Sequence, residues 1–87
     1  MKIEFAKSLA GHDVNQIYLV IRSDDKFLYL VNGTTRTIDA PKKKNRRHLQ
    51  RIKSLPSEVR DCLLQEITDT TIKRAIKLYC HAMDDKH

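Results

Sequence analysis

The spacing of hydrophobic residues changes along the chain, from strand-like in the first half to helix-like in the last third. Ile3, Phe5 and Leu9 share one side of an alternating pattern, which is typical of a half-buried strand. Segment 17–21 is rich in β-branched and aromatic residues and is apolar on both faces, so it predicts a strand that is covered on both sides. Segment 27–31 predicts a third apolar strand. Polar residues separate these segments and predict turns.

Asn32-Gly33 follows the third predicted strand, and we expect a tight hairpin there because both residues tolerate positive φ. Residues 34–38 then predict a fourth strand, which Pro41 ends. The residues after Pro41 are expected to be extended, with a fifth strand around 46–51. Several short strands with tight turns in so short a stretch favour a small curled sheet or barrel.

Helical spacing begins after Pro56 and Ser57, which are suitable entry residues, and predicts a helix over 57–67. Asp69 is expected to cap a second helix that runs to about Met83. The second helix carries an apolar stripe made of Ile72, Ala75, Ile76, Tyr79, Cys80 and Met83. The chain is therefore predicted to be mainly β with C-terminal α. Residues 1–53 form the sheet or barrel, and residues 54–87 form a two-helix hairpin within the same globular unit.

The net charge of +6 is concentrated in one stretch, residues 42–53, which reads KKKNRRHLQRIK. This stretch has seven Lys or Arg and no Asp or Glu, whereas the residues before and after it are close to neutral. Such a concentration is typical of a surface that binds a polyanion. The expected phosphate contacts are Lys42, Lys43, Lys44, Arg46, Arg47, Arg51 and Lys53.

Two parts of the sequence resemble one family. The segment SLAGHD at 8–13, followed by the apolar strand at 17–21, resembles the KOW motif. The later order of an Asn-Gly hairpin, a strand, then PKKKN at 41–45 and His48-Leu49 resembles the small bacterial KOW-domain RNA-binding proteins, which are similar to eukaryotic-type ribosomal proteins of the large subunit. The resemblance covers roughly residues 3–50. It implies an SH3-like barrel that binds RNA, most naturally ribosomal RNA.

The resemblance also implies roles for individual residues. Gly11 and His12 are expected to touch RNA; the alternative is a plain turn in which Asp13 bonds a nearby N–H. Asn15 stands where the family usually has a second glycine, and Asn can adopt the same positive φ. His48 is expected either to hydrogen-bond a ribose or base, or to pack beside the neighbouring leucine.

Other side chains offer weaker signals. Tyr18, Phe27 and Tyr29 can stack on bases, but at strand spacing they are predicted to be core side chains. Cys62 and Cys80 lie on apolar helix faces and are expected to be buried thiols. The four histidines lack compact ligand spacing and no Cys-x-x-Cys accompanies them, so we expect no metal or other cofactor.

These observations predict a non-enzymatic, cytoplasmic RNA-binding protein. The sequence has no phosphate-binding glycine loop and no nucleophile motif, and so small a core encloses little room for a small-molecule substrate. No apolar run approaches the roughly 18 residues of a membrane span, and no Trp or Phe interrupts the basic run to insert into lipid. The expected partners are ribosomal RNA and, beside it, ribosomal proteins. The alternative is a protein-interaction adaptor that docks through the amphipathic helices at 57–83.

Overall fold

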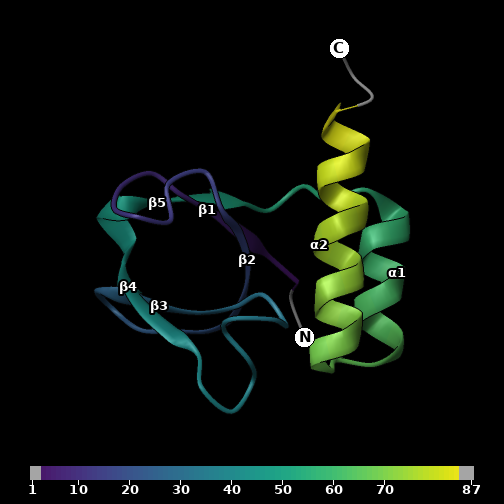
Figure 1. The fold of residues 1–87 in the computed structure, drawn as a ribbon, viewed down its shortest axis with the longest axis horizontal. Coiled ribbons are helices and arrows are strands. Elements are labelled where there is room, and N and C mark those ends of the chain that lie inside the picture. The colour runs from purple at the N-terminus through teal and green to yellow at the C-terminus, as the bar shows by residue number, and fades with distance from the viewer. Residues whose placement is uncertain (1–2, 85–87) are drawn as a thin grey trace.

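The computed structural model describes residues 3–84, which form five strands, one short 3₁₀ turn and two helices (Figure 1). The elements are β1 (Phe5–Ser8), β2 (Ile17–Ser23), β3 (Phe27–Val31), β4 (Lys42–Asn45), η1 (Arg46–His48), β5 (Leu49–Ile52), α1 (Ser57–Gln65) and α2 (Asp69–Asp84). The prediction of a mainly β chain with C-terminal α is confirmed.

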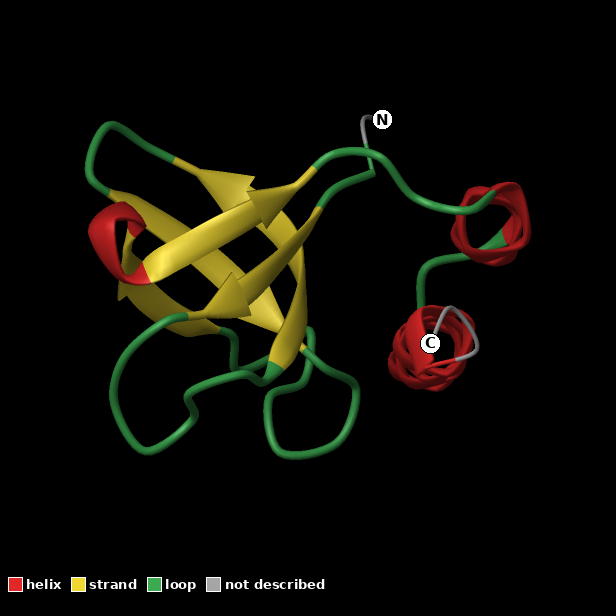
Figure 2. Ribbon diagram, turned by 90° about the horizontal axis from the view of Figure 1, so that it is seen from above, coloured by secondary structure: helices red, strands yellow, loops and turns green. Residues whose placement is uncertain are grey.

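The five strands form one antiparallel sheet in the order β4-β3-β2-β1-β5. The sheet curls strongly, with both helices on one side of it (Figure 2). A bulge between Val20 and Arg22 in β2 adds to the local twist. The edge strands β4 and β5 are joined through η1 but are not paired with each other in the described part of the chain, so the sheet is open.

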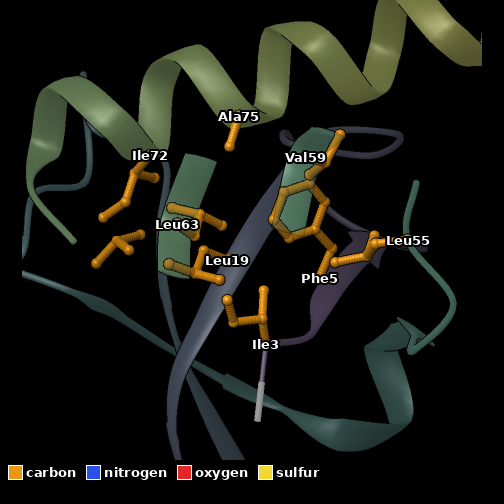
Figure 3. Close-up of a cluster of buried hydrophobic side chains, with 9 residues drawn as sticks. Ile3, Phe5, Leu19, Leu55, Val59, Leu63, Ile72 and Ala75 are labelled. Atoms are coloured by element: carbon orange, nitrogen blue, oxygen red, sulfur yellow. The ribbon is translucent and has the colours of Figure 1, made fainter. Parts of the chain in front are cut away.

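The curled sheet buries hydrophobic side chains on both faces. The inner cluster consists of Ala6, Tyr18, Val20, Leu28, Leu30 and Leu49. The outer cluster consists of Ile3, Phe5, Leu19 and Val31 together with Leu55, Val59, Leu63, Ile72 and Ala75, and lies between the sheet and the two helices (Figure 3). Because side chains alternate along a strand, the fully apolar segments at β2 and β3 supply both clusters at once. This explains their lack of a polar side.

Both helices follow the predicted spacing. Helix α1 begins at Ser57 with Pro56 at its N-cap position, and ends at Gln65, two residues before the predicted end. Ile67 lies beyond the helix but still packs against the outer cluster. The ring of Tyr79 meets that of Phe5 edge-on, with centroids 5.4 Å apart. The apolar stripe of α2 therefore packs largely against the chain's own sheet.

The prediction that Asp69 caps α2 is wrong, because Thr68 has this role. The Thr68 hydroxyl accepts a hydrogen bond from Thr71 N (3.2 Å), and Thr68 N donates to the Thr71 hydroxyl (2.9 Å). This reciprocal pair satisfies donors that the first helical turn leaves open. The Asp69 carboxylate instead accepts from Ile38 N, across to another part of the molecule (2.9 Å).

The predicted fourth strand at 34–38, and the tight hairpin before it, are also wrong. The Asn32 side-chain oxygen accepts from Thr34 N, the Thr34 hydroxyl and Arg36 N, and these bonds hold a compact loop. Gly33 has a φ of +79°, as the turn signal suggests. The loop runs from residue 32 to residue 41 and leads into β4, so the basic run itself supplies the fourth strand.

The basic run is ordered along its length, but not as a single strand around 46–51. Residues 42–45 pair with β3, residues 46–48 form the 3₁₀ turn, and residues 49–52 pair with β1. Asn45 caps the turn, because its side-chain oxygen accepts from Arg47 N (2.9 Å). No helix in residues 3–84 is both long enough and apolar enough to cross a membrane.

Candidate nucleic-acid interface

The β1–β2 loop and the connection from β4 to β5 lie on the side of the sheet away from the helices (Figure 1). The loop between β1 and β2, residues 9–16, carries Gly11 and His12, and both are exposed. Leu9 N donates to His48 O (2.8 Å), which fastens this loop to η1. The structure thus brings two segments with separate family resemblance, 8–13 and 41–49, into one place. Within the loop, Asn15 has a φ of +71°, so the expectation that it adopts positive φ is confirmed.

The three lysines of β4 do not share one face of the sheet. Lys42 and Lys44 lie opposite Leu30 and Leu28, two residues of the inner cluster, whereas Lys43 lies opposite Tyr29 on the outer face. This is the ordinary alternation of a strand. Two of the three lysine side chains therefore leave the strand on its buried side, and only their terminal ammonium groups reach polar partners.

Asp13 is the partner of both inward lysines. Its two carboxylate oxygens lie 2.7 Å from Lys42 Nζ and 2.7 Å from Lys44 Nζ. The same carboxylate accepts from the Ser8 hydroxyl (2.9 Å) and the Tyr18 hydroxyl (2.7 Å). Asp13 thus joins β1, β2 and β4. The expected bond from a nearby backbone N–H to the Asp13 carboxylate is wrong, because these four side-chain donors surround it instead, although residues 11–16 do form turns.

The Asp13 cluster, defined as Asp13, Ser8, Tyr18, Lys42 and Lys44, is poorly accessible to solvent. The side chains of Asp13 and Lys44 are 14% and 10% exposed. Burial by itself would raise the pKa of Asp13, but hydrogen bonds from both lysines, Tyr18 and Ser8 outweigh it and hold the pKa well below its usual range. Burial, and then the hydrogen bond to Asp13, raises the pKa of Tyr18 to about 12. The cluster is a fixed ionic brace.

A second carboxylate neutralises Arg51. Its guanidinium donates from Nε to Glu4 Oε2 (2.9 Å) and from a terminal nitrogen to Glu4 Oε1 (2.6 Å), which is the two-pronged geometry that suits this pair. The Glu4 side chain is 7% exposed. Asp13 and Glu4 therefore compensate three cations of a run that contains no acid. The local sequence cannot reveal this, because both acids are far away along the chain.

The remaining predicted contacts are accessible. Lys43, Arg47, His48 and Lys53 are exposed, and Arg46 is half-buried with its Nε donating to Asp24 O (2.8 Å). Arg46, Arg47 and His48 lie together on η1 beside the 9–16 loop. Lys53 follows β5 on the segment that leads to α1, so it is separated from η1 by the length of that strand.

Sequence reasoning missed cations outside the basic run that lie beside it in space. Arg22 follows the bulge of β2 and lies opposite Tyr29, with its Cζ 5.0 Å from the ring centroid. Lys26 O accepts from Arg46 N (3.0 Å), which places the β2–β3 turn against η1. The sequence signal that could have indicated these neighbours is the alternation along β3. Phe27 and Tyr29 lie on the opposite side of this strand from the residues of the inner cluster.

No protein-family model matches this sequence, and no curated protein is significantly similar to it.

Proposed function

We propose that this protein is a non-enzymatic RNA-binding protein whose binding surface is the β4–η1 edge together with the 9–16 loop. The observation that carries the proposal is that η1, with exposed Arg47 and His48, is bonded to the loop that carries exposed Gly11 and His12. Exposed Lys43 lies on β4, the strand that leads into η1. Arginine forks and lysine point charges suit phosphate oxygens, and release of counterions favours such contacts. The expected readout is of backbone and shape.

We further propose that the curled sheet is an SH3-like barrel of the KOW type. Two features support this: the strand order places β1 between β2 and β5, and a 3₁₀ turn joins β4 to β5. On the resemblance, the RNA is ribosomal and the protein acts in the cytoplasm beside ribosomal proteins.

The basic run divides into two roles within this proposal. Lys42, Lys44 and Arg51 hold the sheet together through Asp13 and Glu4. The phosphate contacts then belong to Lys43, Arg46, Arg47 and Lys53, with His48 beside them. The adaptor alternative loses its main support, because Ile72, Ile76 and Tyr79 of the α2 stripe pack against the chain's own outer cluster.

A pair of charge-matched variants tests this division. Lys43→Gln/Arg47→Gln removes two exposed cations, and Lys42→Gln/Lys44→Gln removes two cations that are bound to Asp13. Each double variant is compared with the unaltered protein for affinity to ribosomal RNA, by a salt titration, and for thermal stability. The exposed pair should weaken RNA binding and reduce the salt slope by about two at unchanged stability. Lys42→Gln/Lys44→Gln should lower the thermal stability and leave the salt slope of RNA binding by the folded protein nearly unchanged.

Either of two results counts against the proposal. One is that the unaltered protein shows no binding to ribosomal RNA at low salt. The other is that Lys43→Gln/Arg47→Gln binds as tightly as the unaltered protein does. A pull-down from lysate with and without ribonuclease complements this test, since it separates contacts mediated by RNA from direct protein contacts.

A further inference from the structure

Two aromatic rings lie on the sheet without contributing to either buried cluster. Phe27 and Tyr29 are half-buried on the outer face of β3, and neither belongs to the inner or the outer cluster among the described side chains. Their strand neighbours Leu28, Leu30 and Val31 are fully buried. The expectation that both rings are core side chains is therefore wrong. Neighbouring apolar side chains outside the core that are rimmed by polar residues are one mark of a contact surface.

A cation lies over each ring. Lys43 Nζ lies 4.3 Å from the ring centroid of Phe27, and Arg22 Cζ lies 5.0 Å from that of Tyr29. The strand register sets this arrangement, because Tyr29 lies directly opposite Arg22 on β2 and opposite Lys43 on β4. The rings and cations thus form a compact patch across three adjacent strands. A shallow hollow of about 390 Å³ opens beside Phe27, between Lys43 and the turn at 24–26.

The patch is positively charged overall, and its acids have local functions. Four cations lie in or beside it, namely Arg22, Lys26, Lys43 and Arg46, and two acids, Asp24 and Asp25. The Asp24 carboxylate accepts from Lys26 N (3.1 Å), Phe27 N (2.8 Å) and the Tyr29 hydroxyl (3.2 Å). Asp24 therefore holds the turn and orients the Tyr29 ring. The four cations leave a surplus of two positive charges for phosphates.

We propose that this patch, defined as Arg22, Phe27, Tyr29 and Lys43, binds unpaired RNA bases by stacking. The inference rests on the proposed RNA-binding function and specifies the form of RNA that is bound. Every base has a π-face, so stacking on Phe27 and Tyr29 needs no particular sequence. Lys43 and Arg22, which lie over these rings in the structure, leave the ring faces on binding and contact the phosphates that connect the stacked bases. Duplex RNA cannot use the patch in this way, because its base faces are already stacked. Because Lys43 shares the β4–η1 edge, a single strand can cross from the patch onto Arg46 and Arg47.

Two matched double variants test the stacking. Phe27→Leu/Tyr29→Leu removes both rings but keeps an apolar, uncharged surface, and the side chains lie outside both clusters, so the fold should survive. Phe27→Tyr/Tyr29→Phe keeps both rings and serves as the control. The probes are an oligouridine and a duplex of the same length, each measured over a range of salt, with circular dichroism to verify folding.

The unaltered protein should bind the oligouridine more tightly than the duplex. A surface acting through charge alone would not, because duplex RNA has the higher charge density. The leucine variant should lose at least about tenfold in affinity for the oligouridine at an unchanged salt slope, and little for the duplex. The ring-exchanged control should bind as the unaltered protein does.

Several outcomes would overturn the inference, and one of them leaves RNA binding intact. If the leucine variant keeps its affinity for oligouridine while Lys43→Gln/Arg47→Gln loses it, the rings do not stack but the proposed function stands. A preference for duplex, or equal losses for both probes in the leucine variant, also rejects stacking. If the unaltered protein binds neither probe at low salt, both the inference and the proposed function fail.

Discussion

Alternation along β4 gives neighbouring residues of the same type opposite roles. Lys42 and Lys44 enter the Asp13 cluster, whereas Lys43 lies over an aromatic ring on the outer face. Residue type alone therefore does not identify the phosphate-binding cations. The direction in which each side chain leaves the strand does, and that direction follows from the register with β3.

Replacing Asp13 with Asn should destabilise the fold by about 2–3 kcal/mol. The substitution leaves two poorly exposed ammonium groups without a counter-charge, and the partial exposure keeps the loss below that of a fully buried pair. Denaturant unfolding at neutral pH measures the loss. Asp25→Asn, at an exposed position, is the control and should change stability by less than about 0.5 kcal/mol.

The same residue predicts the acid limb of the stability curve. The pKa of Asp13 is lower in the folded protein than its ordinary value, so the unfolded chain takes up the proton first. The stabilisation from Asp13 is then complete above the ordinary Asp pKa of about 4 and decreases as the pH falls below it. Between about pH 2 and pH 6, the melting temperature should change more steeply with pH for the unaltered protein than for Asp13→Asn. Equal slopes would show that Asp13 is not the group responsible.

The two glycines allow a direct comparison of strain and close packing. Both have positive φ, +92° at Gly11 and +79° at Gly33. A Cβ on Gly11 would meet its neighbours at ordinary distances, but one on Gly33 would lie 2.2 Å from Asp69 O in the first turn of α2. Gly11→Ala should therefore lose about 1 kcal/mol of stability, and Gly33→Ala at least about 3 kcal/mol. Similar losses in denaturant unfolding would show that the loop at 32–41 does not dock on α2 this closely.

At the scale of elements, some helices and strands are held by contacts that the sequence pattern reveals, and other segments by contacts that it does not. The two helices, and the strands at 17–23 and 27–31, could be predicted because their hydrophobic patterns reflect burial directly. The segment 34–38 could not, because strand-forming threonines there are overruled by the hydrogen bonds of the Asn32 side chain. The basic run gave no periodic signal, since its lysines alternate between faces without a change of residue type.

The cap of α2 gives a test at this scale. Thr68→Ala removes the hydroxyl that accepts from Thr71 N and should destabilise the protein by about 1 kcal/mol. Thr70→Ala, at an exposed position in the first turn, is the matched control and should have almost no effect. Thermal unfolding followed by circular dichroism distinguishes them. Equal melting temperatures for the two variants would contradict the assignment of Thr68 as the cap.

For the whole molecule, fewer cations are available to phosphate than the basic run suggests. The sequence counts seven cations in the basic run, but Asp13 and Glu4 occupy three of them, and both acids come from the first strand region and its loop. The sequence could therefore indicate the segment that carries the candidate site, but not which of its cations are paired with carboxylates. Long-range pairing of this kind depends on how the sheet folds, and a count along the chain does not contain it.

The salt dependence of RNA binding should report this smaller number of cations. Four phosphate contacts from Lys43, Arg46, Arg47 and Lys53 give a log–log slope of about −3 to −3.5, whereas seven would give about −5 to −6. A titration from low to physiological salt with ribosomal RNA separates these values. A slope of the larger size would mean that the lysines of the Asp13 cluster exchange their carboxylate for phosphate on binding.

The outer cluster joins β1, near one end of the described chain, to α2, near the other. A chain made from its N-terminus onward can pair β1, β2 and β3 early, because these strands are consecutive neighbours. Phe5 and Leu19, however, remain open to water until Ile72 and Ala75 have been synthesised and folded against them. Completion of this cluster is therefore tied to the synthesis of α2, and any chain that stops before α2 presents an uncovered apolar sheet, the kind of surface that promotes aggregation.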